Sequence, residues 1–74
     1  MSGEHAVVLV YSTSHALKAE RVLQGIEVEC KLIPVPRRLS SDCGVCVRIE
    51  RADRQKAYQA LRVAGMEIEG IHDI

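Results

Sequence analysis

Aromatic residues are almost missing from this sequence of 74 residues, which has two tyrosines and neither phenylalanine nor tryptophan. Proteins that bind single-stranded nucleic acid stack the bases on such side chains. An excess of positive charge is missing too, because ten lysines and arginines balance ten aspartates and glutamates. Nucleic acid is therefore not expected as a partner, and the core must be aliphatic.

Long hydrophobic runs are also lacking. The longest, Ala6 to Tyr11, is far shorter than the roughly 20 apolar residues that span a bilayer. No basic stretch precedes it as in a secretory signal, so we expect a cytoplasmic protein with no membrane partner. Cysteine is also scarce, and the three cysteines are an odd number. A disulfide framework is therefore not expected, and at least one thiol should remain reduced.

The length suits one small domain, residues 1–74, and is too short for two. Runs of β-branched and alternating residues predict strands, and apolar residues at helical spacing, followed by Gly25 and Gly65, predict helices that end at those glycines. Pro34 and Pro36 stop the second strand, and a loop follows. The expected order is βαββαβ, with strands at 6–11, 26–32, 45–49 and 66–69 and helices at 14–24 and 53–64.

An internal repeat supports this order. A shift of 40 residues superposes Gly25–Glu29 on Gly65–Glu69, and Val7 and Leu9 on Val47 and Ile49. Two βαβ halves with right-handed crossovers interleave into a four-stranded antiparallel sheet of order 4-1-3-2, with both helices on one face. The sequence therefore predicts an α+β, ferredoxin-like fold.

The second face of that sheet has no helix to cover it. We expect four residues to lie there: Val8, Val10, Cys46 and Arg48. An exposed apolar surface of this kind is unfavourable in a monomer. A homodimer formed through the open sheet face is therefore one expected assembly.

The predicted topology brings the entry to the third strand close to the start of the first helix. Cys43 and Gly44 stand at that entry. Free N–H groups at a helix start favour an anion, and so does the positive charge of Arg37 and Arg38, so a thiolate at Cys43 would be stabilised. A partly exposed, electropositive cysteine is the usual reactive kind. Cys43 is therefore the candidate for chemistry, although loop cysteines are often inert.

Residues at the helix start are candidates to line the same place. Ser12, Thr13 and Ser14 are helix caps first, and their hydroxyls and amides would also suit a small anion. His15, in the first turn, is near enough to orient or deprotonate Cys43, or is a simple surface histidine. Arg37 and Arg38 are either anion-facing or a solvated pair.

Cys43 and Cys46 also form a Cys-x-x-Cys spacing, which serves redox couples and soft metals. A zinc site needs four ligands, and the three histidines do not complete one, so no metal and no cofactor is expected. In an extended strand these two positions face opposite ways, and only a bend at Gly44 would bring the sulfurs together. Cys46 is thus a resolving thiol or a structural residue, and Cys30 a small core residue.

Four segments carry a resemblance to a known family: Tyr11–Glu20, Leu32–Arg37, Ser40–Gly44 and Glu67–Ile71. The chain resembles the small bacterial domains of the selenium/sulfur carrier-like family. The Pro-Val-Pro-Arg segment that leads into Ser-x-Cys-Gly is the most specific part. The resemblance implies that Cys43 holds sulfur or selenium, with Gly44 after it and Arg37 before it. Cys46 departs from the small apolar residue expected there.

Three functions remain open from the sequence. In the first, which is not enzymatic, Cys43 accepts sulfur or selenium as a persulfide or selenosulfide from a donor such as a cysteine desulfurase and passes it to an acceptor enzyme. In the second, the positive loop binds a small anion or metabolite and the domain regulates a partner. In the third, Cys43 and Cys46 act together in thiol redox chemistry or metal delivery.

Overall fold

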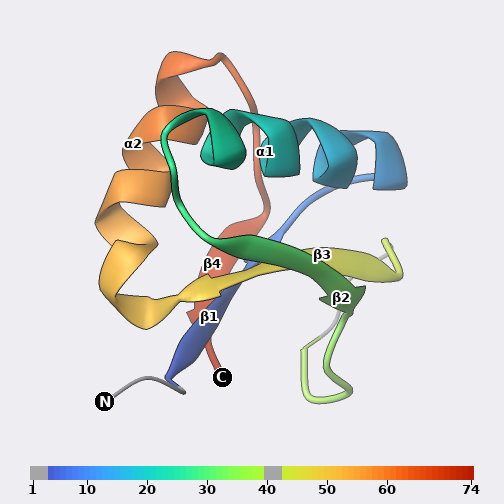
Figure 1. Cartoon of the computed structure of the whole chain (residues 1–74). Helices are drawn as coiled ribbons and strands as arrows, with labels where there is room; N and C mark the ends of the chain where they lie inside the picture. Colours follow the sequence, from blue (N-terminus) through green and yellow to red (C-terminus); the bar gives the residue numbers. More distant parts are fainter. Residues whose placement is uncertain (1–3, 40–42) are drawn as a thin grey trace.

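The computed structural model describes residues 4–39 and 43–74. Four strands form one antiparallel sheet in the order β2-β3-β1-β4, which is the expected order 4-1-3-2 read from the other edge. Both helices cover the same face of this sheet (Figure 1). The bounds are β1 His5–Leu9, α1 Thr13–Gly25, β2 Cys30–Pro34, β3 Val45–Glu50, a 3-10 turn Arg51–Asp53, α2 Arg54–Val63 and β4 Gly70–Asp73. The α+β, ferredoxin-like fold is confirmed.

Small residues bring the helices close to the sheet. The buried face of α1 consists of Ala16, Ala19 and Leu23, and that of α2 of Ala57 and Leu61. They pack on β-branched side chains from the two central strands, Val8 of β1 and Val47 of β3 among them. The main core thus lies between the helices and the sheet, and it is aliphatic as expected. In the described residues neither helix combines the length and apolarity needed to cross a lipid bilayer.

The last strand begins later than the sequence predicts. Residues 66–69 were expected to form it, but β4 spans Gly70–Asp73. The reason is the end of α2, where the Met66 N–H donates to the Leu61 carbonyl at 3.0 Å. This bond from the residue after the left-handed Gly65, whose φ is 75°, is a Schellman motif. Met66 therefore caps the helix and packs in the core, and the chain needs three more residues to reach the sheet.

The second strand begins late for the same reason. Its predicted range was 26–32, and its observed range is Cys30–Pro34. The Val28 N–H donates to the Leu23 carbonyl at 2.9 Å, which caps α1. The alternation in the sequence was still informative, because the apolar positions all pack against the main core: Ile26, Val28, Cys30 and Leu32.

These two helix ends also correct the internal repeat. They make Leu23 equivalent to Leu61 and Val28 equivalent to Met66, a shift of 38 residues rather than 40. The shift of 40 superposes Val7, which lies on the open face, on Val47, which lies under the helices. The two βαβ halves are alike, but a single shift does not relate all of their elements.

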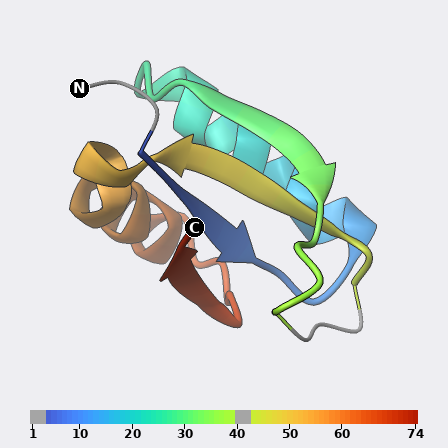
Figure 2. The same ribbon diagram turned by 90° about the horizontal axis from the view of Figure 1, so that it is seen from below.

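The open face carries two of the four residues expected there, Cys46 and Arg48. Val8 and Val10 lie under the helices in the main core, so their assignment to the open face was wrong. Strand alternation places Val7 and Leu9 there in their stead, and these two residues form a second buried cluster with Cys46. The segment after β2 descends below the sheet at the end where β2 stops (Figures 1 and 2), and its Val35 and Leu39 side chains pack against this cluster. The partly buried residues that complete the cover are Ile33, Val35, Leu39 and Ile74.

We predict that the two left-handed helix ends respond oppositely to substitution. Glu27, at the end of α1, has a φ of 61°, which a glycine adopts without the cost of about 1 kcal/mol that other residues have. Glu27→Gly should therefore raise the free energy of unfolding, measured by urea denaturation, by about 0.5–1 kcal/mol. Gly65→Ala should lower it by about 1 kcal/mol, although no atom lies within 4 Å of the added Cβ. A stabilised Gly65→Ala would contradict the assigned conformation.

Candidate functional site

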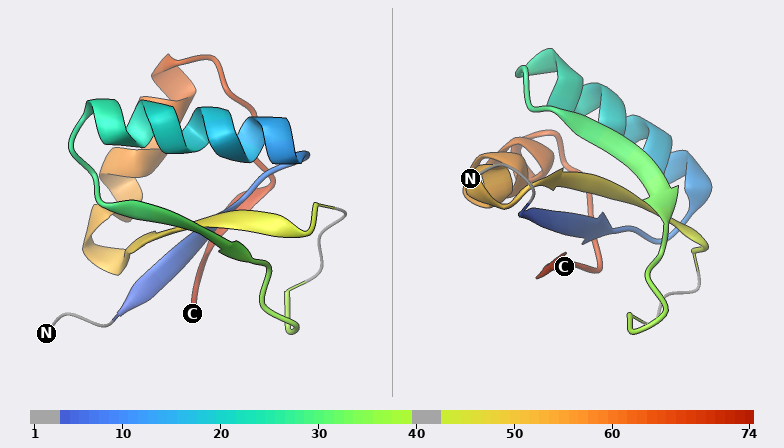
Figure 3. Two further views of the ribbon diagram at one scale, coloured as in Figure 1. Left: turned by 45° about the vertical axis from the view of Figure 1, so that its right-hand side comes forward. Right: turned by 60° about the horizontal axis from the view of Figure 1, so that its bottom comes forward.

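The start of α1 and the start of β3 lie at the same end of the molecule in every view (Figures 1, 2 and 3). The expected juxtaposition of these two segments is therefore present. Ser40, Ser41 and Asp42, which belong to the Ser40–Gly44 segment, lie outside the described residues. Cys43 is the first described residue after this gap, and it directly precedes Gly44 and β3.

Cys43 faces the helices and is buried. Its exposed fraction is 5%, and it belongs to the main core cluster with Val10, Ala16 and Val47. The expectation of a partly exposed thiol is therefore wrong. The physical reason is strand alternation: Cys43 extends the row that Val45 and Val47 form under the helices. Alternation predicted that Cys43 and Cys46 face opposite ways, but Cys43 was taken as a loop residue and its burial was not predicted.

The Cys43 thiol has a local hydrogen bond. Its Sγ donates to the Val45 carbonyl oxygen at 3.2 Å. Only the protonated thiol has a hydrogen to donate, so this geometry belongs to the resting S–H form. A reaction at this sulfur therefore begins with two changes: the side chain leaves its apolar surroundings, and this bond to Val45 breaks.

Cys46 lies on the other face of the sheet. It is fully buried in the second cluster with Val7 and Leu9, and its Sγ lies 3.9 Å from the Pro34 carbonyl oxygen. Burial, with a smaller contribution from the neighbouring Cys43, raises the pKa of the Cys46 thiol to about 11. Near neutral pH Cys46 is a protonated thiol in a dry environment, which is a poor state for a resolving nucleophile.

The Cys-x-x-Cys spacing therefore does not form a common site. Gly44 does not bend the chain enough to place both sulfurs on one face, because Cys43 and Cys46 belong to separate clusters. The three cysteines, all within the described residues, form no disulfide. In residues 4–39 and 43–74, no three histidine, cysteine or carboxylate side chains gather as a metal ion would require.

The helix start is capped as the sequence predicts. The Ser12 Oγ accepts a hydrogen bond from the His15 backbone N–H at 3.2 Å, and it lies 2.6 Å from the His15 Nδ1. This contact occupies Nδ1, with donor and acceptor set by the tautomer of the imidazole, and Nε2 is the ring nitrogen that does not contact Ser12. Thr13, Ser14 and His15 are all exposed, whereas Cys43 is buried.

The two arginines before the site differ. Both are exposed, but the Arg38 guanidinium donates to the Asp73 backbone carbonyl at 3.0 Å. Asp73 lies in β4, at the edge of the sheet, and Arg38 follows β2, at the opposite edge. Arg38 is therefore engaged at β4, while Cys43 faces the helices. This geometry therefore does not place the positive charge of Arg38 beside Cys43, as the sequence had led us to expect.

Arginine side chains bind along the outer edge of β4, which was not predicted from the sequence. The Ile74 N–H donates inward to the His5 carbonyl, so by alternation the Ile71 and Asp73 carbonyls face outward. Arg54 donates to Ile71 at 3.5 Å and to the Asp73 carboxylate at 3.0 Å, and Arg38 donates to the Asp73 carbonyl. Arg51 adds an ion pair to Asp73 at 3.6 Å. These side chains occupy acceptors that would otherwise pair with another strand.

We predict that Cys46 makes the protein less stable in alkali. Between pH 9 and pH 11 the unfolded thiol ionises while the folded thiol keeps its proton. The unfolded state then binds fewer protons, so the free energy of unfolding should fall across this window by about 1–2 kcal/mol from this group. Urea denaturation at both ends of the window should show a smaller fall for Cys46→Val, which has no thiol at this position. Equal falls for both proteins would contradict the buried, protonated state.

Comparison with known protein families gives one match. The family described as "Putative Se/S carrier protein-like" matches residues 5–73, which include every strand and helix. Searches of curated proteins and of solved structures give no match. The match covers nearly the whole chain and agrees with the resemblance seen in the four segments above. The chain belongs to the family of Se/S carrier-like proteins.

Proposed function

We propose that this protein is a stoichiometric carrier that holds sulfur or selenium on Cys43 and passes it between partner enzymes. Family membership supports the proposal. The observation on which it chiefly rests is the position of Cys43. This thiol lies at the end of the sheet, two residues before the first residue of β3, and is kept apart from Cys46 by the sheet itself.

The transfer is an exchange at sulfur. The Cys43 thiol first loses its proton to water, and the thiolate then attacks the terminal sulfur of a donor persulfide, R–S–SH. The donor S–S bond breaks, its thiolate R–S⁻ leaves with the electron pair, and Cys43 becomes Cys–S–SH. A selenium atom bound in the same way would give a selenosulfide. The acceptor enzyme reverses this step with a nucleophile of its own.

Burial gives the carrier a defined resting state. With an exposed fraction of 5%, Cys43 reacts slowly with small thiols and oxidants, because their attack requires access to the sulfur. A partner that binds this end of the sheet and draws Cys43 out of the main core would expose the thiol. Transfer would then occur within a complex, and cargo would be protected outside it.

Gly44 supports this view of partner approach. It is exposed, its φ is outside the left-handed region, and no atom of the described residues beyond its two chain neighbours lies within 4 Å of a Cβ placed on it. The fold therefore does not require a glycine at this position, although glycine lowers stability through its conformational entropy. A close approach by a partner beside Cys43 is a reason for a residue without a side chain.

We predict that Cys43 is the residue that carries the cargo. After incubation with a cysteine desulfurase and cysteine, intact-mass spectrometry should show one added sulfur atom on the wild type and on Cys30→Ala, and none on Cys43→Ser. Thermal unfolding of each variant checks that it is folded. Equal labelling of Cys43→Ser would place the cargo elsewhere. An unlabelled wild type beside a loaded control carrier would reject the proposal.

We also predict that a side chain at Gly44 slows the transfer without harming the fold. Gly44→Val should keep or slightly raise the thermal unfolding temperature, since valine suits an extended backbone, and should reduce the rate of sulfur loading by about tenfold or more. Gly25→Ala is the matched control, because it also has no atom within 4 Å of the added Cβ. Loading of Gly44→Val at the wild-type rate would show that partners do not approach there.

A further inference from the structure

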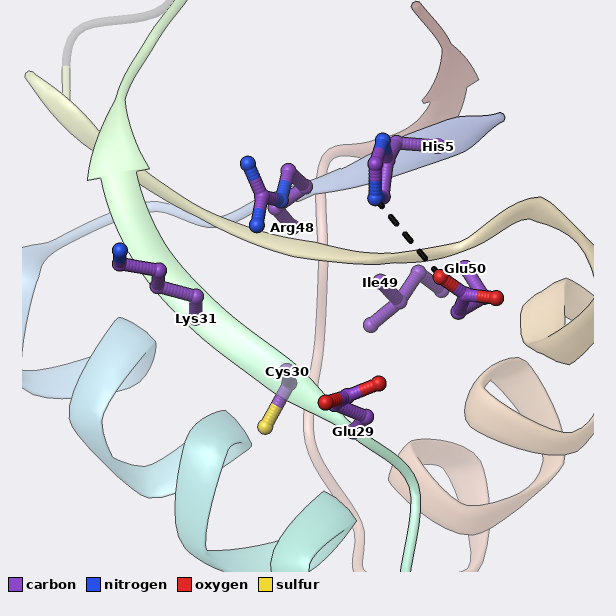
Figure 4. A pocket seen from close by; sticks show the side chains of 7 residues that line it. All are labelled: His5, Glu29, Cys30, Lys31, Arg48, Ile49 and Glu50. Atoms are coloured by element: carbon purple, nitrogen blue, oxygen red, sulfur yellow. Dashed lines mark ion pairs between the residues drawn. The ribbon is translucent and has the colours of Figure 1, made fainter. Parts of the chain in front are cut away.

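The open face has a charged half beside its apolar half. A hollow of about 230 Å³ lies over this charged half, and it is lined by His5 of β1, by residues of β2 and β3, and by Glu29, which directly precedes β2. Figure 4 shows Lys31 and Arg48 on one side of the hollow and Glu29 and Glu50 on the other, with His5 above Glu50. The Cys30 sulfur turns away toward α1. This place is separate from Cys43, which lies under the helices.

The register of β2 and β3 pairs charges of the same sign. Lys31 lies directly opposite Arg48. Continued by one residue beyond Cys30, the same register sets Glu29 opposite Glu50. Like charges in directly opposite positions destabilise a sheet. The two Glu residues lie two positions from the two cations, on the same face and about 7 Å away along the strands, so the face has a positive row next to a negative row.

The rows do not neutralise one another within the chain. Neither Lys31 nor Arg48 forms an ion pair with a residue in the part of the chain that the structure describes. Glu50 has His5 beside it, with the His5 Nε2 and the Glu50 carboxylate 3.7 Å apart. Arg48 is half-buried between β2 and β1. Two unpaired cations and two carboxylates thus face one small hollow.

We infer that this hollow binds a small zwitterion of the α-amino acid class. Its carboxylate would accept hydrogen bonds from Lys31 and Arg48, and its ammonium group would donate to Glu29 and Glu50. Such a ligand converts both like-charge pairs into charge-assisted hydrogen bonds. A simple anion would satisfy only one row and be repelled by the other. The volume is below that of sites for drug-sized molecules, which suits a ligand of this size.

The test uses L-serine, which carries both charges and has no thiol to react with the cysteines. Titration of the isotope-labelled protein, followed by amide NMR shifts, should give saturable changes confined to β2, β3 and His5. At matched ionic strength, 3-hydroxypropionate has only the carboxylate and ethanolamine only the ammonium group. Each should bind at least about tenfold more weakly than L-serine. Equal binding of L-serine and either half-ligand would overturn the zwitterion assignment.

Four variants localise the site. Lys31→Gln and Glu29→Gln should each weaken L-serine binding by at least about tenfold. The matched controls Lys18→Gln and Glu67→Gln remove the same charges at exposed positions elsewhere and should bind as the wild type does. Cys43→Ser should also bind normally, which separates this inference from the carrier proposal. Shifts that do not saturate, or that persist unchanged in both site variants, would overturn it.

Discussion

The alternation of side chains along β3 is the constraint on which the rest of the structure depends. Odd-numbered residues of this central strand, such as Val45 and Val47, face the helices, and even-numbered residues, such as Cys46, face the open side. The register with β1 and β2 fixes this assignment, because a slip of one residue would move every side chain to the other face. The same rule, extended two residues before the strand, places Cys43 in the core.

Because of this alternation, the two faces of the sheet carry different kinds of side chain. The face under the helices is dry and aliphatic, and it contains most of the buried side chains. The open face is divided along its strands. At the end near Cys43 it carries Leu9 and Cys46 beneath the segment after β2, and at the other end it carries charged residues such as Lys31 and Arg48. The argument for a dimer weakens accordingly, because the apolar half is covered from within the chain. The homodimer itself remains a prediction.

Local sequence patterns predicted the fold correctly where a segment fitted only one kind of element, a helix or a strand. Ser12 caps α1 as expected, and the order of strands and helices is right. The errors lie where a helix end competes with a strand for the same residues. Val28 and Met66 look like strand residues, but their N–H groups complete helix caps. Only the folded chain shows that these bonds take precedence, because they depend on left-handed residues that include Glu27, which no glycine rule would identify.

The candidate site was predicted in its location and not in its environment. Topology correctly brought the start of α1 to the end of the sheet where Cys43 lies. The burial of Cys43 follows from alternation beyond the formal strand, and the position of Arg38 follows from a bond to Asp73, 35 residues away along the chain. Contacts over such separations have no local signature. The arginines around β4 were missed for the same reason.

The separation of the two thiols bears directly on whether a carrier or a redox couple is the better interpretation. A persulfide on Cys43 would be lost if a second thiolate of the same chain attacked it and formed a disulfide. Cys46 is the nearest candidate in sequence, but it lies across the sheet, and burial raises its pKa to about 11. Both features suppress that attack. A redox couple requires two sulfurs that meet, whereas a carrier requires that its cargo persist until a partner takes it, and this arrangement of Cys43 and Cys46 favours the second requirement.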